Sequence, residues 1–309
     1  MNKKLIVHML VLLIVIVMVG AAELLNENEI IFPEITAIAV GALIAPKMHW
    51  KTTRLRMLAC IMLCAIAGVC IVLLVPGPSW FKITLAYGIA EVIFLCSGTS
   101  FAPMISAIAL PVLLGTESPI YLIAAFLLTA FILCLHIMLE MTGIKEPAAR
   151  FKPVKVDKQD WQDAVMRLIF VGIAAWLVLR SGNRYIIAPP LLVAFTEFSR
   201  RDSSARKIPV KAVSTIALCA LAGSLCRYYI HLTWGMPLTL AAATAALLMI
   251  FIMEHMKVYI PPAGALCILP MLLPAKMVVG YPVQIFIGAA LFMILSLLMF
   301  RSKSHISVN

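Results

Sequence analysis

The sequence predicts an all-α polytopic membrane protein made of two repeats in the same orientation. Of its 309 residues, 63% are hydrophobic and 13% are charged, whereas apolar residues make up about 45–50% of a typical globular domain. The apolar residues form blocks, many of them near the roughly 20 residues that a helix needs to cross a bilayer. Similar segments also recur 155 or 159 residues apart. The short alternating segments of a transmembrane β-barrel are absent.

The hydrophobic blocks number about six in each half of the chain. The first block follows Lys3 and Lys4 and lacks a convincing cleavage site, so we expect a retained first helix and not a signal peptide. Several blocks are too short for a full crossing, and we expect these segments to be tilted or broken. The blocks cover approximately residues 5–25, 31–46, 57–75, 81–97, 101–114, 119–141, 165–180, 185–198, 211–230, 238–256, 260–274 and 283–300.

The long polar stretch after the sixth block divides the chain. We expect a first transmembrane repeat over 1–141, a cytoplasmic linker over 142–164 and a second transmembrane repeat over 165–309. With six crossings in each half, 20 of the 25 Lys and Arg residues fall on one side. The positive-inside rule then predicts that both termini are cytoplasmic and that the protein lies in the inner or plasma membrane.

The net charge of +11 has the same explanation. Basic stretches interleaved with aromatic residues, which are typical of nucleic-acid binding, are absent, so no nucleic-acid partner is expected. The expected partners are the lipid bilayer and a small molecule or ion. Whether the protein also forms a homo-oligomer stays open.

Three pairs of segments carry the internal repeat. They are "LCAIAG" (63–68) with "LCALAG" (218–223), "FAPMISAIALP" (101–111) with "IPPAGALCILP" (260–270), and "IIFPEITAI" with "YIIAPPLLVAF". In the second pair Pro103 aligns with Pro262 and Pro111 with Pro270. Because six is an even number of crossings, the repeats are parallel and related by an axis along the membrane normal. Such an axis predicts either a central pathway between the halves or a duplication that replaces a homodimer interface.

The second half resembles a known family at this point. "IPPAGALCILPMLL" resembles the His-Pro-Pro signature of the HPP family of small membrane proteins, in which the dipeptide is followed by Ala-Gly-Ala. "APPLLVAFTEFSRRDSSARKIPVKAV" resembles the family's other recurrent stretch. The resemblance covers roughly 185–300 and, more faintly, 31–141. It implies a short bundle of transmembrane helices and, because some members are linked to nitrite transport, a small inorganic anion as substrate. Ile260 replaces the family's histidine.

The start of the "PPAGA" segment is a candidate solute site, made of Pro261, Pro262, Ala263 and Gly264. Proline is tolerated at the first position of a helix, where its missing N–H is not needed. Free amides of the next turn and the helix dipole favour anions, and the small residues allow close approach. The alternative is that the prolines only begin a helix and the small residues only pack.

The matching segment of the first half, "CSGTSFAP" (96–103), supplies the other candidates: Ser97, Gly98, Thr99, Ser100 and Pro103. Hydroxyl groups and amides at a broken helix can replace water around a small ion. The alternative is a polar loop in which Ser and Thr cap helix ends.

Glu91 lies inside an apolar block and is the predicted proton-coupling residue, because a charged side chain within a span is costly and usually functional. The alternative is a structural pair with a cation on a neighbouring helix. The glutamates near block ends are expected to be interfacial charges; they are Glu23, Glu34, Glu140, Glu197 and Glu254.

The sequence contains no recognisable catalytic or cofactor motif. Ser/His/Asp and Cys/His sets, phosphate-binding loops and dinucleotide fingerprints are absent. The eight cysteines lie in apolar blocks without a metal-binding spacing. We therefore expect no catalytic residue, metal or cofactor, and a non-enzymatic function.

The predicted function is an integral membrane transporter or permease for a small solute, preferably a small inorganic anion such as nitrite. Transport would be passive or coupled to an ion gradient. The alternative is a non-transporting membrane scaffold or subunit of a larger complex. An enzyme acting on lipid would need clustered carboxylates, which the scattered glutamates do not supply.

Overall fold

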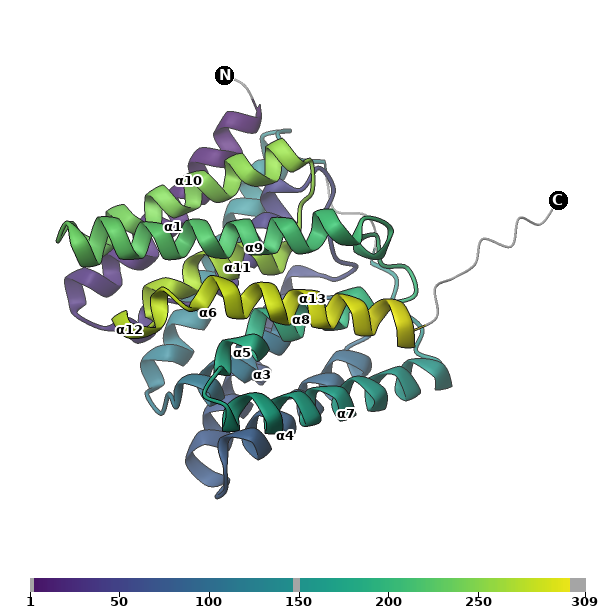
Figure 1. The fold of residues 1–309 in the computed structure, drawn as a ribbon. Helices are drawn as coiled ribbons and strands as arrows, with labels where there is room; N and C mark the ends of the chain where they lie inside the picture. The colour runs from purple at the N-terminus through teal and green to yellow at the C-terminus, as the bar shows by residue number, and fades with distance from the viewer. Residues whose placement is uncertain (1–2, 147–150, 301–309) are drawn as a thin grey trace.

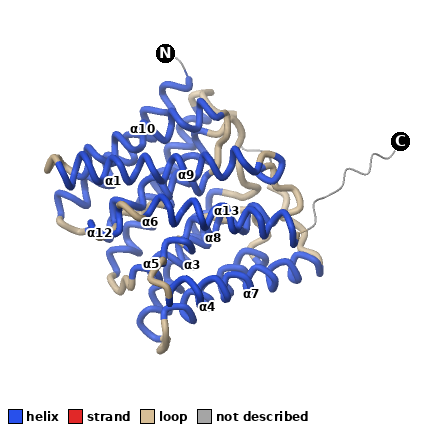
Figure 2. The backbone as a smooth tube through the Cα atoms, in the orientation of Figure 1, coloured by secondary structure: helices blue, strands red, loops and turns tan. Residues whose placement is uncertain are grey.

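The computed structural model describes residues 3–146 and 151–300, and the regular structure within these ranges is entirely helical (Figure 2). Eight of the described helices are long and apolar enough to cross a membrane. The expected all-α polytopic class is confirmed. The long helices are α1 (Lys3–Leu25), α3 (Arg54–Leu74), α4 (Ser79–Cys96), α6 (Pro119–Met141), α7 (Lys158–Arg180), α9 (Pro209–Leu225) with its π-helical extension η5 (Cys226–Thr233), α10 (Leu238–Met256) and α13 (Tyr281–Met299).

Four short helices lie between the long ones. They are α2 (Glu34–Ala39) with the π-helical η2 (Val40–Ile44), α5 (Met104–Leu114), α8 (Pro189–Ser199), and α11 (Pro261–Ile268) with the 3-10 turn η6 (Leu269–Leu272). Eleven residues of α-helix span about 16 Å, which is about half of a bilayer's hydrocarbon core. The short, broken segments expected from the sequence are therefore present.

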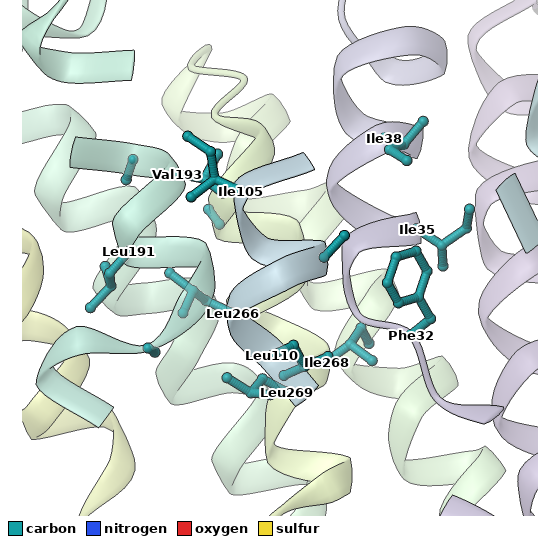
Figure 3. Packing of buried hydrophobic residues seen from close by; sticks show 14 of the residues in the cluster. Phe32, Ile35, Ile38, Ile105, Leu110, Leu191, Val193, Leu266, Ile268 and Leu269 are labelled. Carbon is teal, nitrogen blue, oxygen red and sulfur yellow. The ribbon is translucent and has the colours of Figure 1, made fainter. Parts of the chain in front are cut away.

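The short helices form the centre of the molecule. Almost all of their residues are buried, and a helix that is buried on every side is apolar on every side. Figure 3 shows their side chains gathered in one apolar cluster, with labels on Phe32, Ile35, Ile38, Ile105, Leu110, Leu191, Val193, Leu266, Ile268 and Leu269. The remaining short elements are η1 (Asn28–Ile30), η3 (Arg184–Ile187), η4 (Ala205–Lys207) and α12 (Ala275–Val278).

Helices of the first half pack on helices of the second half in pairs. Helix α1 packs on α10, and α4 packs on α7; the first pair lies towards the top of Figure 1 and the second at its bottom edge. In the centre α2 packs against α11, and α5 packs against α8. Each pair takes one helix from each half, as two parallel repeats around a twofold axis would.

Two glycines occupy equivalent crossings in the halves. A Cβ added to Gly68 of α3 would lie 2.5 Å from the carbonyl oxygen of Ile108 in α5. A Cβ added to Gly223 of α9 would clash with the carbonyl oxygen of Cys267 in α11. Both glycines end the repeated "LCAIAG" and "LCALAG" segments, so the sequence match reflects a shared close approach of two helices.

Two tyrosines repeat a second contact. Tyr121 of α6 donates a hydrogen bond to the Ala107 carbonyl oxygen at 2.8 Å, and Tyr281 of α13 donates to the Leu266 carbonyl oxygen at 2.8 Å. Both hydroxyls bind backbone in the middle of a short helix that contains proline (Pro111 in α5, Pro270 in the α11–η6 segment). Proline frees a carbonyl within a helix, and a buried hydroxyl finds such an acceptor.

Helix α7 begins before the hydrophobic block expected at 165–180. The Asp157 side chain accepts from the Asp160 N–H at 2.9 Å, and the Asp160 side chain accepts from the Asp157 N–H at 2.8 Å, which forms a capping box. Residues 158–164, assigned to the linker from the sequence, are thus the first two turns of α7. Arg167, expected among the loop charges, lies buried within the bundle.

The basic residues gather at one end of the bundle, which we call the basic end. Ion pairs and hydrogen bonds tie its helix ends together: Lys4 with Glu254, Arg54 with Glu140, Lys145 with the Ala45 carbonyl, and Arg201 with Asp157. Arg150, Arg301 and Lys303, expected on the same side, lie outside the described residues. A cytoplasmic orientation of this end stays a prediction.

Candidate functional site

Three adjoining cavities, of about 760, 380 and 200 Å³, open at the basic end. Arg200 and Asp202 line all three. We call the largest cavity the basic vestibule. Its lining includes two acidic residues, Glu146 and Asp202, against six basic ones: Lys47, Lys51, Lys145, Lys152, Lys155 and Arg200. A concave site with such an excess of positive charge attracts anions and raises their local concentration.

The loop that follows α2 builds one wall of the vestibule. Trp50 donates from Nε1 to Glu197 Oε1 of α8 at 3.0 Å, and its ring meets the Phe101 ring edge-on, with 5.0 Å between centroids. The indole also covers Gly41, where a Cβ would clash with it. These contacts hold the loop against the start of α5 and the end of α8, so this wall is supported from both halves of the chain.

The same loop is paired with the break between α4 and α5. The Lys51 N–H donates to Ser100 Oγ at 2.8 Å, and the Ser100 N–H donates to the Lys51 carbonyl oxygen at 3.1 Å. The pairing fixes the backbone of Lys51, while its ammonium group has no hydrogen-bond partner among the described residues. The ammonium groups of Lys47, Lys152 and Lys155 are likewise without a partner in that part of the chain and can meet a solute.

Lys145 and Arg200 are held more firmly. The Lys145 ammonium donates to the Ala45 carbonyl oxygen at 2.5 Å, and burial lowers the pKa of Lys145. Arg200 donates to the Asp202 carboxylate at 3.2 Å and to the Ser100 carbonyl oxygen at 3.4 Å. These two side chains therefore form the fixed part of the cationic lining.

A surface ion pair lines the smallest cavity. Arg201 donates two hydrogen bonds to Asp157, at 2.9 and 3.0 Å, and they lower the pKa of Asp157 to about 2. This pair fastens the start of α7 to the turn that follows α8.

Two of the hydroxyls in the "CSGTS" break, those of Ser97 and Thr99, bind within the loop itself. Ser97 Oγ donates to the Phe94 carbonyl oxygen at 2.8 Å and lies 2.9 Å from Thr99 Oγ1. Gly98 has a positive φ of 63°, and its carbonyl accepts from the Val154 N–H at 2.8 Å. Thr99 and Ser100 line the smallest cavity. Pro103 is buried directly before the first residue of α5. The capping alternative accounts for the contacts of Ser97 and Thr99, whereas Gly98 and Ser100 bind other segments.

The start of α11 offers no free amide to an anion. Pro261 and Pro262 have no N–H, and the Ala263 N–H donates to the Ile260 carbonyl oxygen at 3.0 Å. Gly264 faces α2, where a Cβ would lie 2.9 Å from the Thr36 carbonyl oxygen. Of these four residues, Pro261 lines the middle cavity, and α11 packs against α2 and α9. The two predicted breaks thus lie at the same end, on either side of Arg200.

Glu91 forms a buried ion pair with Arg167 of α7. The guanidinium donates from Nε to Oε1 at 2.8 Å and from Nη2 to Oε2 at 2.6 Å, and Glu91 and Arg167 are only 3% and 4% exposed. Thr196 of α8 donates to Oε1 at 3.1 Å, and Arg167 Nη1 donates to Ser199 Oγ at 3.3 Å. This is the structural alternative to proton coupling, and it joins α4 of the first half to two helices of the second.

The sequence misplaced Glu34, which was expected to be an interfacial charge. It is the first residue of α2 and is completely buried. Ser106 of α5 donates to its Oε1, and its Oε2 has no hydrogen-bond partner in the part of the chain that the structure describes. The signal that could have revealed it is a carboxylate directly after Pro33, at the start of a short apolar block rather than at its end.

The comparisons with known proteins leave the family open. No family model matches the chain, no curated protein matches its sequence, and no solved structure matches its fold. The resemblance to the HPP family stays a prediction from the sequence.

Proposed function

We propose that the protein transports a small anionic solute across a membrane and that the basic vestibule is where the solute first binds. The observation that carries the proposal is the excess of basic side chains around a cavity of about 760 Å³, several of them with ammonium groups free to bind. The resemblance to the HPP family favours a small inorganic anion such as nitrite. By the positive-inside rule the vestibule faces the cytoplasm.

The core of short helices explains why transport requires a change of conformation. The residues beneath the vestibule are buried and apolar, so an anion cannot pass through this arrangement without exposing polar groups or water to it. A movement of one repeat against the other would open a path at the repeat interface, as in other transporters built from repeats. In the absence of an ATP-binding motif, the movement would be passive or driven by an ion gradient.

Nitrite uptake into proteoliposomes tests the proposal. The variant Lys51→Gln/Lys152→Gln removes two vestibule charges that make no described hydrogen bond, and we expect uptake at low salt to fall about tenfold. The matched control is Arg184→Gln/Lys276→Gln, which removes two exposed charges from the opposite end and should leave uptake unchanged. Uptake no faster than in protein-free vesicles, or equal uptake in the two variants, would reject the proposal and favour the scaffold alternative.

A further inference from the structure

Glu34 is a completely buried carboxyl group with one oxygen unsatisfied. Its relative exposure is 0%. Oε1 accepts from the Ser106 hydroxyl, and Oε2 has no hydrogen-bond partner among the described residues. Leaving an ionised carboxylate in such surroundings is costly, because burial removes its hydration and no described cation replaces it. A bound proton removes the charge and with it most of that cost.

No described cation offsets the charge of Glu34. The salt bridges of the described residues do not include it, although they include Glu91, Glu140, Glu197 and Glu254. The helices packed around it carry titratable groups that bind elsewhere or are uncharged thiols and phenols. These are Lys3, Lys4, His8 and Glu23 of α1, Tyr121, Cys134, His136 and Glu140 of α6, and Cys267 of α11; α5 has none.

The position of Glu34 connects it to the moving parts of the proposed transporter. It begins α2, which packs against α11 of the other half, and its hydrogen bond reaches Ser106 on α5, which packs against α8 of the other half. A charge that forms here would lie in the core of short helices, where α2 and α5 each pack against the other half, and would favour any arrangement in which these helices separate and admit water.

From this geometry we propose that Glu34 is a proton-binding site and that the closed core contains its neutral acid form. When the short helices separate, the O–H bond of the acid breaks, the proton passes to water, and the carboxylate is stabilised by hydration. Coupling of this step to solute movement rests on the proposed transport function; the proton site itself does not.

Infrared difference spectroscopy of the full-length protein in lipid tests the proton site without a solute. A rise in pH should remove the C=O band of a protonated carboxylic acid from the wild-type spectrum. The band should be missing in Glu34→Gln and present in Glu254→Gln, which removes a carboxyl group at the basic end instead. If Glu34→Gln does not fold, Glu34→Asp should retain the band at a changed frequency.

The outcomes separate the two proposals. A wild-type spectrum without such a band, or a band of full size in Glu34→Gln, overturns the proton site even if nitrite is transported. A band that depends on Glu34, in a protein that moves no nitrite, supports the proton site and rejects nitrite transport. With both present, coupling predicts that an imposed pH gradient drives nitrite uptake in the wild type and no longer does so in Glu34→Gln.

Discussion

Glu91 and Glu34 are two buried carboxyl groups with opposite surroundings. Glu91 is surrounded by donors: the Arg167 guanidinium on both oxygens and the Thr196 hydroxyl on one. Glu34 accepts from the neutral Ser106 hydroxyl and has no cation beside it among the described residues. A carboxylate with a bidentate cation is stabilised in its charged form, so Glu91 is suited to hold helices together, and Glu34 is suited to gain and lose a proton.

Removing the charge of Glu91 should therefore destabilise the protein. Glu91→Gln leaves the Arg167 guanidinium buried without a counter-ion, and the expected loss is about 3–5 kcal/mol in the free energy of unfolding. The double variant Glu91→Gln/Arg167→Met removes both charges and should recover most of that loss. Reversible unfolding in detergent, followed by circular dichroism, measures both.

The pair Lys4–Glu254 provides the control, because the Lys4 side chain is 69% exposed. Glu254→Gln should cost at most about 1 kcal/mol, as an exposed ion pair does. A loss of the same small size in Glu91→Gln would contradict the structural role of the buried pair and would restore Glu91 as a candidate for proton coupling.

At the scale of the elements, proline and glycine explain where short helices begin and how closely they pack. Prolines occupy the first turn of α8 and α11, as they do in α6 and α9. Proline is readily recognised as a helix start, so the short helices could be predicted from the sequence. Which glycine lies at a crossing could not, because close approach depends on the partner helix, which is distant in the chain.

The glycines at the two crossings should tolerate no side chain. Gly68→Ala and Gly223→Ala each place a methyl group against a backbone carbonyl oxygen, and backbone yields less easily than a side chain end. We expect each change to cost about 1–3 kcal/mol, the usual cost of overpacking. Thermal unfolding in detergent measures the effect.

Gly20 of α1 is the matched control for this pair. A Cβ there would make ordinary contact with the Thr239 side chain of α10, with 3.6 Å to Oγ1. Gly20→Ala should keep or slightly increase stability, since alanine favours a helix over glycine by about 1 kcal/mol. Equal losses in all three variants would show that the repeated glycines have no special role in packing.

At the scale of the whole molecule, the sequence predicted the all-α class and the end at which the charges collect, and its matched segments predict the repeat. These follow from hydrophobic block lengths, matched segments and loop charges, which are local properties. The packing of helices across the halves could not be predicted, because each block is apolar and nothing in its sequence identifies the helix on which it packs. For the same reason the site was only partly predicted: Thr99, Ser100 and Pro261 line cavities, but the lysines of the vestibule seemed to be ordinary loop charges.

Because helices pack across the halves, we expect the halves to stay together when the chain between them is cut. A site for a specific protease inserted after Glu146, which is exposed beyond the end of α6 at Met141, would allow the covalent link between the two repeats to be cut. Because α1 packs on α10 and α7 packs on α4, and because Glu91 and Arg167 pair across the halves, the fragments should elute as one species from a size-exclusion column in mild detergent.

Adding Glu91→Gln should weaken the association of the fragments, whereas Glu254→Gln should not. The partner of Glu254, Lys4, belongs to α1, which packs on α10. Two fragments that elute separately without either substitution would show that each repeat is an independent domain and would rule out a solute path built from helices of both.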